Sequence, residues 1–548
     1  MQASRRWPPG WPRRRYSVQK LKVLVTDKID PEGLKPLQVH PGIDLRYEVA
    51  PKADVLEKAL IGTDVWLVRS ETKITSEWIG KAPALRLIGR AGVGVDNIDL
   101  AAATRRGVAV INAPAANTLA AAEHTLALIL SVSRHVAQAD ASVKAGKWER
   151  SKFMGVELFG KTLGVVGLGR IGREVAKRAQ AFGMKVVGFD PFVSEAQARD
   201  LGIEPCPLAD LLKTADFVTL HVPGGDKTKH LISAESLKTV KKGLRLVNCA
   251  RGELIDEAAL AEALKDGRVA AAGLDVFSAE PLPADSPLRS APNVVLTPHL
   301  GASTAEAQSR VATELAQAVV DFHEKGIAPN ALNLPGFDAS TVAALGEWLP
   351  LAESLGRFLA QTLEGGVREF ACQFEGEFKA AERRPLGVCA LKGLLTPIMG
   401  TSVSWISAPA MAAERGIRVS ESVDPKSSEG VRRLLTVSAV TDAGTVSVSG
   451  SVLAPGEPRL LRFGALRVDV RPAGKMIVLT NTDAPGVIGR VGTLLGRAGV
   501  NIADMRVGRR SAHGEAVMVL NVDEAVSPEV RAELSRLDGI RRVHWVEL

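Results

Sequence analysis

The sequence predicts an α/β protein in which residues 21–333 form two lobes, each built on a doubly wound parallel sheet, and the remainder after them is α+β. Two observations predict the parallel sheets: short apolar runs rich in β-branched residues alternate with helical patterns, and the runs end at Gly, Pro or a charged residue. A third observation, the order strand, helix, strand, strand, helix, strand over 475–548, predicts a small domain after them.

Length and composition describe a globular protein of several domains. The chain has 548 residues, of which 46% are hydrophobic and 24% are charged. No uninterrupted apolar stretch reaches the roughly 20 residues that a membrane-spanning helix needs. We therefore expect no membrane partner.

Most of the net positive charge lies in a short leader. The formal net charge is +8, and residues 1–20 contain five Arg, one Lys and no acidic residue. Removing these six charges leaves +2 for the rest of the chain, which therefore lacks the basic surface that nucleic-acid binding requires. We interpret residues 1–20 as a disordered basic extension, with a targeting segment as the alternative.

The four cysteines predict neither a metal centre nor a disulfide framework. Cys206, Cys249, Cys372 and Cys389 lie far apart, without Cys-x-x-Cys spacing. Such sparse cysteines fit a reducing compartment, and we expect a cytoplasmic protein.

The first predicted lobe begins at Leu21. Its buried strands are predicted by LKVLVTD at 21–27, DVWLVR at 64–69, LRLIGRA at 85–91 and VAVINAP at 108–114. One long helix is predicted over Thr118–Val143, which contains the run AEHTLALILSVSR.

Six further runs predict the second parallel sheet. They are KTLGVVG at 161–167, MKVVGFD at 184–190, ADFVTLHVP at 215–223, LRLVNCA at 244–250, VAAAGLDVF at 269–277 and NVVLTPH at 293–299. Because the connections between them are long enough for helices, a doubly wound sheet is the economical interpretation. A helix is predicted over 304–325.

The amino-acid composition changes after that helix. Pro329 and Pro335 bracket a linker, and from there to about Pro472 the chain is rich in Gly, Ser and Thr, with weak alternating strands such as LLTVSAVTD at 434–442. The βαββαβ order over 475–548 is that of a ferredoxin-like unit.

A dinucleotide site is predicted at Gly167-Leu168-Gly169-Arg170-Ile171-Gly172. This GxGxxG follows a strand and opens a helix, so a pyrophosphate can approach bare backbone at a helix N-terminus. Asp190 ends the next strand, where a carboxylate accepts bonds from ribose hydroxyls and repels the 2′-phosphate of NADP. We therefore expect NAD as the cofactor.

Polar side chains follow three strands of the same sheet. Arg251 lies in NCARG, Asp275 and Glu280 lie in GLDVFSAEP, and His299 lies in TPHLGAS. A histidine can take the hydroxyl proton when a secondary alcohol is oxidised, and a neighbouring carboxylate stabilises the imidazolium. A planar Arg can hold the carboxylate of a 2-hydroxy acid through two hydrogen bonds.

These motifs resemble the D-2-hydroxyacid dehydrogenase family. The resemblance rests on GLGRIG with Asp190, the HVP turn, NCARGELIDE, AAGLDVFSAEP and TPHLGASTAEAQ, in this order. Segments 90–124 and 148–172 are similar to the long-form D-3-phosphoglycerate dehydrogenases, and the resemblance covers 21–548. It implies NAD-dependent oxidation of 3-phospho-D-glycerate to 3-phosphooxypyruvate, the entry to L-serine synthesis.

The resemblance also implies roles for residues. His299 is the acid/base, Glu280 its partner and Arg251 the group that binds the substrate carboxylate and carbonyl. The positions that match NAD contacts are Val93, Gly167, Gly169, Arg170, Ile171, Gly172, Asp190, His221, Val222, Pro223, Thr228, Cys249, Ala250, Arg251, Asp275, His299, Gly301 and Ala302. Those on the substrate side are Arg69, Ser70, Arg90, Gly92, Val93, Gly94 and Asn117. No metal is implied.

The same resemblance predicts the domain organisation. The substrate-binding lobe is discontinuous, at 21–117 and 304–333, and the NAD-binding domain is 118–303. An intervening domain with an allosteric-substrate-binding character is expected at 334–472. The helix over Thr118–Val143 and the residues around Arg134 to Lys152 would lie at the dimer interface of a homo-oligomer, a dimer or a tetramer, although an intrachain core helix would look the same.

Residues 475–548 resemble an ACT-type regulatory domain, in the run TNTDAPGVIGRVGTLLGRAGVNIADM at 480–505. Val487, Ile488, Val491, Leu494 and Leu495 predict one apolar helix face. The residues expected to bind an effector, which is L-serine in this interpretation, are Asn481, Asp483 and Asn501. A purely structural assembly domain is the alternative.

Two other functions share these motifs. One is a reductase of glyoxylate, hydroxypyruvate or another small 2-oxo acid, and the other is an NAD-sensing corepressor of the C-terminal-binding-protein type. The ACT-like tail and the basic loops on the substrate side favour the phosphoglycerate enzyme over both.

Overall fold

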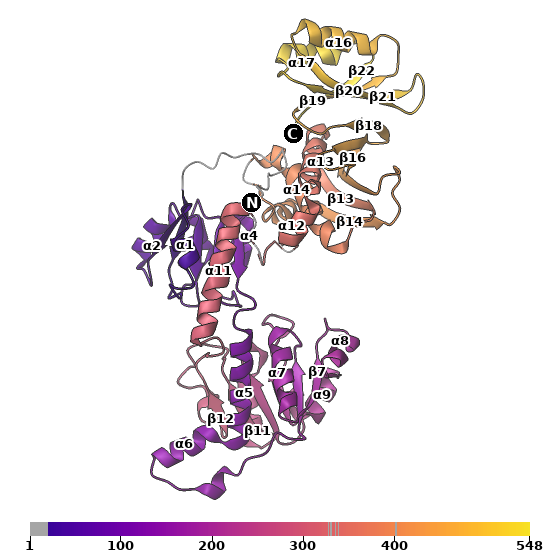
Figure 1. Cartoon of the computed structure of the whole chain (residues 1–548). Coiled ribbons are helices and arrows are strands. Elements are labelled where there is room, and N and C mark those ends of the chain that lie inside the picture. The colour runs from indigo at the N-terminus through magenta and orange to yellow at the C-terminus, as the bar shows by residue number, and fades with distance from the viewer. Residues whose placement is uncertain (1–19, 327, 329–330, 335, 338, 401–402) are drawn as a thin grey trace, which may run out of the picture.

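Four β-sheets follow one another along the chain. The computed structural model describes residues 20–548 except 327, 329–330, 335, 338 and 401–402. Two parallel sheets come first, then a mixed sheet and last an antiparallel one (Figure 1). This is the predicted fold class, two Rossmann-like lobes followed by an α+β domain and a ferredoxin-like domain. The predicted leader lies outside the described residues except for Lys20.

The first sheet has five parallel strands in the order β2-β1-β3-β4-β5. They are β1 Leu21–Val25, β2 Ile43–Tyr47, β3 Val65–Val68, β4 Leu87–Arg90 and β5 Ala109–Asn112. Its helices are α1 Lys35–Gln38, α2 Ala53–Leu60, α3 Ser76–Gly80, α4 Leu100–Arg105 and, from much later in the chain, α11 Ala305–Lys325. Apolar clusters lie on both faces of the sheet, and Leu315 and Val319 of α11 pack into one of them. The sheet is therefore covered on both sides, as buried parallel strands require.

The second sheet has seven parallel strands in the order β12-β11-β10-β9-β6-β7-β8. They are β6 Thr162–Val166, β7 Lys185–Phe189, β8 Glu204–Pro205, β9 Phe217–Leu220, β10 Leu244–Asn248, β11 Val269–Leu274 and β12 Val294–Leu296. The helices around it are α5 Thr118–Arg134, α7 Arg170–Ala181, α8 Glu195–Asp200, α9 Leu208–Thr214 and α10 Glu257–Lys265. The order reverses between β6 and β9, so a crevice opens there at the carboxyl edge. The six predicted strands are present, and two-residue β8 is the addition.

The prediction of one helix over Thr118–Val143 is wrong. Helix α5 ends at Arg134, and α6 Val136–Lys144 begins after His135, whose φ of 53° is left-handed. The carbonyl of Ser133 accepts the N–H of Val156 at 2.9 Å. A segment later in the chain thus bonds to a carbonyl oxygen in the last turn of α5. The helix breaks at His135, since histidine is among the residues that tolerate a left-handed backbone.

The third sheet has six strands in the order β14-β13-β15-β16-β17-β18, and only β13 and β14 run parallel. They are β13 Val367–Gly376, β14 Arg418–Asp424, β15 Arg433–Thr441, β16 Gly444–Val452, β17 Pro458–Phe463 and β18 Leu466–Val470. The helices of this part are α12 Ala339–Leu345, α13 Trp348–Thr362, α14 Ala380–Met399 and α15 Ala408–Glu414. The strand pattern alone did not predict this helical layer.

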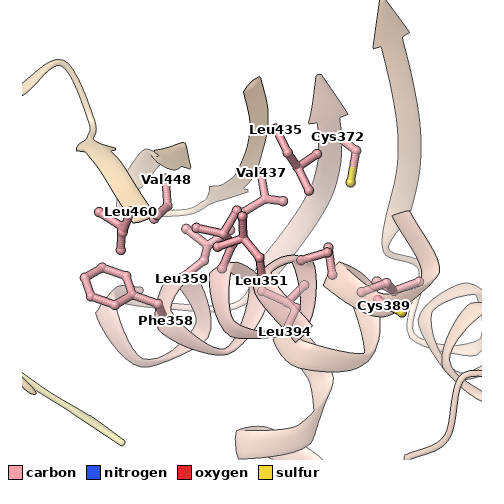
Figure 2. Packing of buried hydrophobic residues seen from close by; sticks show 14 of the residues in the cluster. Leu351, Phe358, Leu359, Cys372, Cys389, Leu394, Leu435, Val437, Val448 and Leu460 are labelled. Atoms are coloured by element: carbon pink, nitrogen blue, oxygen red, sulfur yellow. The ribbon is translucent and has the colours of Figure 1, made fainter. Parts of the chain in front are cut away.

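Helices α13 and α14 cross in close contact. A Cβ on Gly356 would lie 1.9 Å from the carbonyl oxygen of Ala390, and one on Gly393 would lie 2.1 Å from that of Glu353. Glycine at both positions lets the backbones approach. Figure 2 shows how Phe358 and other apolar side chains fill the space between the helices and the sheet. Full burial of such a side chain contributes about 1.5–3 kcal/mol.

The last sheet is antiparallel, in the order β20-β21-β19-β22. Its elements are β19 Lys475–Thr482, α16 Val487–Arg497, β20 Ile502–Arg509, β21 Glu515–Val522, α17 Pro528–Arg536 and β22 Ile540–Glu547. The predicted βαββαβ order is confirmed. On the predicted apolar face of α16, Val487, Val491 and Leu495 are buried, whereas Ile488 is 47% exposed and so does not belong to the core.

Among the described residues, no helix combines the length and the apolar character needed to cross a membrane.

Candidate active site in the cleft between the two parallel-sheet lobes

A cleft of about 660 Å³ lies between the two parallel-sheet lobes. The first lobe lines it with Arg69 after β3 and with Arg90 at the end of β4. The second lobe lines it with Arg251, Glu280 and His299, which follow β10, β11 and β12. Strand ends from both sheets thus meet at one cavity, as the carboxyl edges of parallel strands allow.

His299 and Glu280 form a pair on the wall of the cleft. Nδ1 of His299 lies 2.8 Å from Oε2 of Glu280, and the other oxygen of Glu280 accepts the N–H of Phe277 at 3.1 Å. Because a carboxylate only accepts, Nδ1 carries the proton and Nε2 keeps a lone pair. The backbone of His299 is left-handed, with φ 57°, a conformation in which histidine is found more often than most residues.

Three arginines, Arg69, Arg90 and Arg251, line the cleft together with several carboxylates. Burial, followed by repulsion from Arg251 and Arg69, lowers the pKa of Arg90 to about 10. Nε of Arg90 is buried and has no hydrogen-bond partner among the described residues. Asp96 is the carboxylate beside Arg251, 3.2 Å from its Nε. The guanidinium groups and the open donor of Arg90 are what binding of a carboxylate or phosphate requires.

Two glycines make room for these arginines. A Cβ on Gly92 would lie 1.8 Å from Nη1 of Arg90, and one on Gly94 would lie 1.9 Å from Nη2 of Arg251. Ser70, Val93 and Asn117 also line the cleft, so the structure brings the predicted substrate-side residues together.

Sequence reasoning missed some of the cleft. Lys28 and Asp30 line it from the loop after β1, and Gln308 lines it from α11. Lys28 could have been found, because it follows a parallel strand as the predicted residues do. Asp27, which is buried, accepts the N–H of Arg69 at 2.7 Å and so orients that loop.

The predicted dinucleotide turn has the geometry that a pyrophosphate needs. Gly167 has φ 97°, and a Cβ there would lie 2.5 Å from the carbonyl oxygen of His221. A Cβ on Gly172 would lie 2.0 Å from the carbonyl oxygen of Gly167. Helix α7 begins at Arg170, so its first N–H groups face this bare backbone.

Asp190 closes the turn from β7. Its two carboxylate oxygens accept the N–H groups of Leu168 and Phe192, both at 2.8 Å, and each oxygen keeps lone pairs for further donors. The remaining NAD-side positions lie in loops after β9, β10 and β12, and they are Val222, Pro223, Thr228, Cys249, Ala250, Gly301 and Ala302.

His221 is half-buried in the turn after β9. Burial lowers its pKa to about 3, and its Nε2 lies 3.0 Å from Oγ1 of Thr219. The ring is thus held against the end of its own strand.

Asp275 lies directly after β11, at the carboxyl edge of the sheet as predicted. Its carboxylate is fully buried and accepts bonds from Thr297 Oγ1 and from the N–H groups of Leu300 and Gly301. The expected contact of Asp275 with NAD stays a prediction.

His124, Cys249 and Asp275 lie within 4.8 Å of one another, a spacing that could hold a metal ion. Burial raises the pKa of Cys249 to about 12, so its thiol stays protonated. Because Asp275 is already surrounded by N–H and O–H donors, we interpret the group as a hydrogen-bond network.

The predicted effector residues are paired within the chain. Asp483 accepts a hydrogen bond from Nη1 of Arg509 at 2.7 Å, and this bond lowers the pKa of the Asp483 carboxyl. Asn501 donates to Asp523 at 2.7 Å. Asn481 is only 3% exposed and donates to the carbonyl of Thr482, and its expected role in effector binding stays a prediction.

Comparisons with known proteins agree with this architecture. Residues 126–301 match the family model of the D-isomer specific 2-hydroxyacid dehydrogenase NAD binding domain. A D-lactate dehydrogenase from Aquifex aeolicus, solved with NAD and lactic acid, is 31% identical, with a TM-score of 0.50 over 55% of this chain and 96% of its own. An NAD-dependent formate dehydrogenase from Staphylococcus aureus, solved with NAD, is 30% identical, with a TM-score of 0.51 over 56% and 96%. Fold and cleft thus define the class, the NAD-dependent D-isomer specific 2-hydroxyacid dehydrogenases.

The remaining matches narrow the class. Residues 344–463 match the D-3-phosphoglycerate dehydrogenase intervening domain, and residues 475–539 match the ACT domain. The D-3-phosphoglycerate dehydrogenases of Methanocaldococcus jannaschii and Bacillus subtilis are 42% and 41% identical, over 96% of this chain and 100% and 99% of theirs. The chain belongs to the D-3-phosphoglycerate dehydrogenase family.

Proposed function

We propose that this chain oxidises 3-phospho-D-glycerate to 3-phosphooxypyruvate with NAD, the first step of L-serine biosynthesis. One observation carries the proposal: a His–Glu pair and three arginines share one cleft beside a dinucleotide turn. A secondary alcohol flanked by a carboxylate and a phosphate needs a base and cations on both sides of the reacting carbon.

The dinucleotide turn fits NAD. A Cβ on Gly167 or Gly172 would meet a backbone carbonyl oxygen, so glycine keeps this turn tight, whereas nothing lies within 4 Å of a Cβ built on Gly169, where a pyrophosphate could approach bare backbone. Asp190 would accept the ribose hydroxyls. The chemistry that NAD supplies when bound is acceptance of the hydride from C2 of the substrate.

His299 is the proposed base. Its Nε2 takes the proton of the C2 hydroxyl, and the carboxylate of Glu280 at Nδ1 stabilises the imidazolium that results. In the reverse reaction the same atom returns the proton to the carbonyl oxygen.

The arginines divide the anionic ends of the substrate between them. Arg251, on the same lobe as His299, would hold the carboxylate beside the reacting carbon. Arg69 and Arg90, on the opposite wall, would hold the phosphate, and a dianion there would supply the partner that Nε of Arg90 lacks among the described residues.

We propose the predicted domain limits with these roles. The packing of α11 on the first sheet supports a discontinuous substrate-binding lobe at 21–117 and 304–333 around an NAD-binding domain at 118–303. The intervening domain at 334–472 and the ACT domain at 475–548 follow. The cytoplasmic location stays a prediction; a relative from Arabidopsis thaliana is described as chloroplastic.

NADH formation tests the proposed activity. The purified enzyme should form NADH from 3-phosphoglycerate and NAD, with D-glycerate and D-lactate as unphosphorylated controls. Rates that favour either control would instead indicate a reductase of small 2-oxo acids.

Removing an arginine of the phosphate wall should separate phosphorylated from unphosphorylated substrates. Arg90→Ala or Arg69→Ala should raise KM for 3-phosphoglycerate by about 10- to 100-fold, since hydrogen bonds to charged groups contribute about 1.5–3 kcal/mol. KM for D-glycerate should change far less. Arg106→Ala, an exposed arginine at the end of α4, is the matched control. Equal losses on both substrates would mean that Arg69 and Arg90 support the fold.

We also propose a homo-oligomer. Helix α6 and the segment after it, residues 136–154, form an arm. Helix α6 buries none of its residues, and four apolar side chains of the arm are exposed: Val136 by 52%, Val143 by 55%, Trp148 by 85% and Met154 by 82%. The arm projects from the NAD-binding lobe (Figure 1). A second copy of the chain would cover these side chains.

L-serine is the proposed effector of the ACT domain. Asp483 pairs with Arg509, the last residue of β20, whereas Asn501 immediately precedes that strand. Eight residues of extended strand span about 26 Å. One serine can therefore contact both residues only if they come from two paired copies.

Calorimetry with L-serine tests this regulation. The unaltered enzyme should bind serine and lose turnover at millimolar serine, and Asp483→Ala should weaken both effects, because the ammonium loses its carboxylate. Asp538→Ala, an exposed acid of the same domain, should leave them unchanged. Sedimentation of the same samples should show at least a dimer. Absence of both binding and inhibition would leave the ACT domain an assembly element.

A further inference from the structure

One side chain of helix α5, that of His124, contacts the ends of two strands of the second sheet. These strand ends lie next to the catalytic loop, residues 297–301, which contains His299. Nε2 of His124 lies 3.1 Å from Oδ1 of Asp275 and 3.1 Å from Oγ1 of Thr297. Asp275 follows β11 and Thr297 follows β12, so His124 connects α5 to the ends of both strands. The side chain of His124 is 19% exposed and that of Asp275 is fully buried.

The neighbours of Nε2 require it to be a donor. The Asp275 carboxylate only accepts, and the Thr297 hydroxyl donates its own proton to Oδ1 of Asp275 at 2.5 Å. Both atoms therefore present lone pairs to His124. The imidazole must carry its proton on Nε2, and it donates a shared hydrogen bond to both oxygens.

Asp275 in turn holds the backbone around His299. Its carboxylate accepts the N–H of Leu300 at 2.7 Å and that of Gly301 at 2.8 Å, and its carbonyl accepts the N–H of His299 at 2.9 Å. The left-handed backbone of His299 lies between these bonds. The orientation of the catalytic imidazole thus depends on where the Asp275 carboxylate is held.

We propose that His124 is a positioning residue that orients His299 through Asp275, and that its contribution is the hydrogen bond donated by Nε2. The inference rests on the proposed role of His299 as the base. Helix α5 begins directly after Asn117, where the chain leaves the substrate-binding lobe, so the bond also ties the catalytic loop to the connection between the lobes.

Two substitutions separate the donor from the bulk of the side chain. His124→Leu fills the space without a donor. His124→Gln places an amide N–H the same number of bonds from Cα as Nε2. Glu123→Gln, at the exposed neighbouring position on α5, is the matched control.

Steady-state kinetics should show a selective loss of turnover. His124→Leu should lower kcat by about 10- to 100-fold, since a misplacement of about 1 Å can cost ~10²-fold. KM for 3-phosphoglycerate and the Kd of NAD should stay close to those of the unaltered enzyme. His124→Gln should recover most of kcat, and Glu123→Gln should change nothing. Unchanged kcat in His124→Leu, or failure of Gln to recover it, would overturn the proposal.

Crystal structures of the two His124 variants give a readout that does not depend on activity. In His124→Leu we expect residues 297–301 to shift and the Nδ1 contact of His299 with Glu280 to lengthen, whereas His124→Gln should keep both. An unmoved loop in His124→Leu would reject the positioning role even if turnover fell. Failure of the unaltered enzyme to oxidise 3-phosphoglycerate would instead reject the proposed function and leave this structural comparison decisive for His124.

Discussion

Replacing His299 by Asn is expected to lower kcat by about 10²–10⁴-fold while NAD binding persists. The loss is large because Nε2 of His299 is the proposed acceptor of the hydroxyl proton. Glu280 cannot take over this role, because it contacts Nδ1, the other nitrogen of the ring. Asparagine is preferred to alanine for this test because residue 299 has φ 57°, and Asn tolerates left-handed backbone with little strain. Turnover is measured as NADH formation, and NAD binding by calorimetry.

Glu280 provides the graded comparison. Glu280→Gln keeps a hydrogen-bond acceptor at Nδ1 but removes the charge that stabilises the imidazolium, so turnover should fall less than in His299→Asn. His135→Asn, at another left-handed histidine outside the cleft, controls for the backbone. Turnover of His299→Asn near that of the unaltered enzyme would end the assignment of His299 as the base.

The unaltered enzyme is expected to prefer NAD over NADP by at least ~10², and Asp190→Ala to lose most of that preference. The Asp190 carboxylate is held at the turn by the N–H groups of Leu168 and Phe192, so it cannot easily move away from a 2′-phosphate. The residues that follow it, 191–195, contain no Lys or Arg to receive that phosphate. The measurement is kcat/KM with each cofactor.

Asp190→Asn separates charge from support of the turn. It removes the negative charge but keeps one acceptor, so it should accept NADP better than the unaltered enzyme and retain NAD better than Asp190→Ala. Asp200→Ala, an exposed acid at the end of α8, should leave the preference unchanged. Equal rates with both cofactors in the unaltered enzyme would contradict the role of Asp190.

Local patterns predicted the parallel sheets and the candidate site together. An apolar run that ends at a charged residue marks both a buried strand and its polar end, and Arg69, Arg90, Arg251 and His299 all follow such runs. Because the carboxyl ends of parallel strands gather at one edge, knowing the strands was enough to expect these residues near one cleft, where the structure places them.

Local patterns failed where a distant segment determines the structure. The sequence has no Gly or Pro at His135, where the helix breaks. The break is accompanied by a hydrogen bond from the N–H of Val156 to a carbonyl oxygen at the end of α5, which depends on a segment later in the chain. Helix α14 was missed because it buries residues on more than one side and so shows no single apolar stripe, whereas α13 has apolar residues at helical spacing and could have been predicted.

Periodicity and turn chemistry were enough to predict most of the parallel strands, the glycine turn and the residue types at the strand ends, because these features depend on residues a few positions apart. Which polar groups are buried became clear only in the folded structure. The Asp275 carboxylate, for example, is surrounded by donors from Thr297, Leu300 and Gly301. Nothing in the local sequence distinguishes His124 from other residues of its helix. In the structure its ring contacts the carboxylate of Asp275, 151 positions away in the chain. Burial of a polar group depends on the surface that arrives from elsewhere in the chain, and no local pattern records that surface.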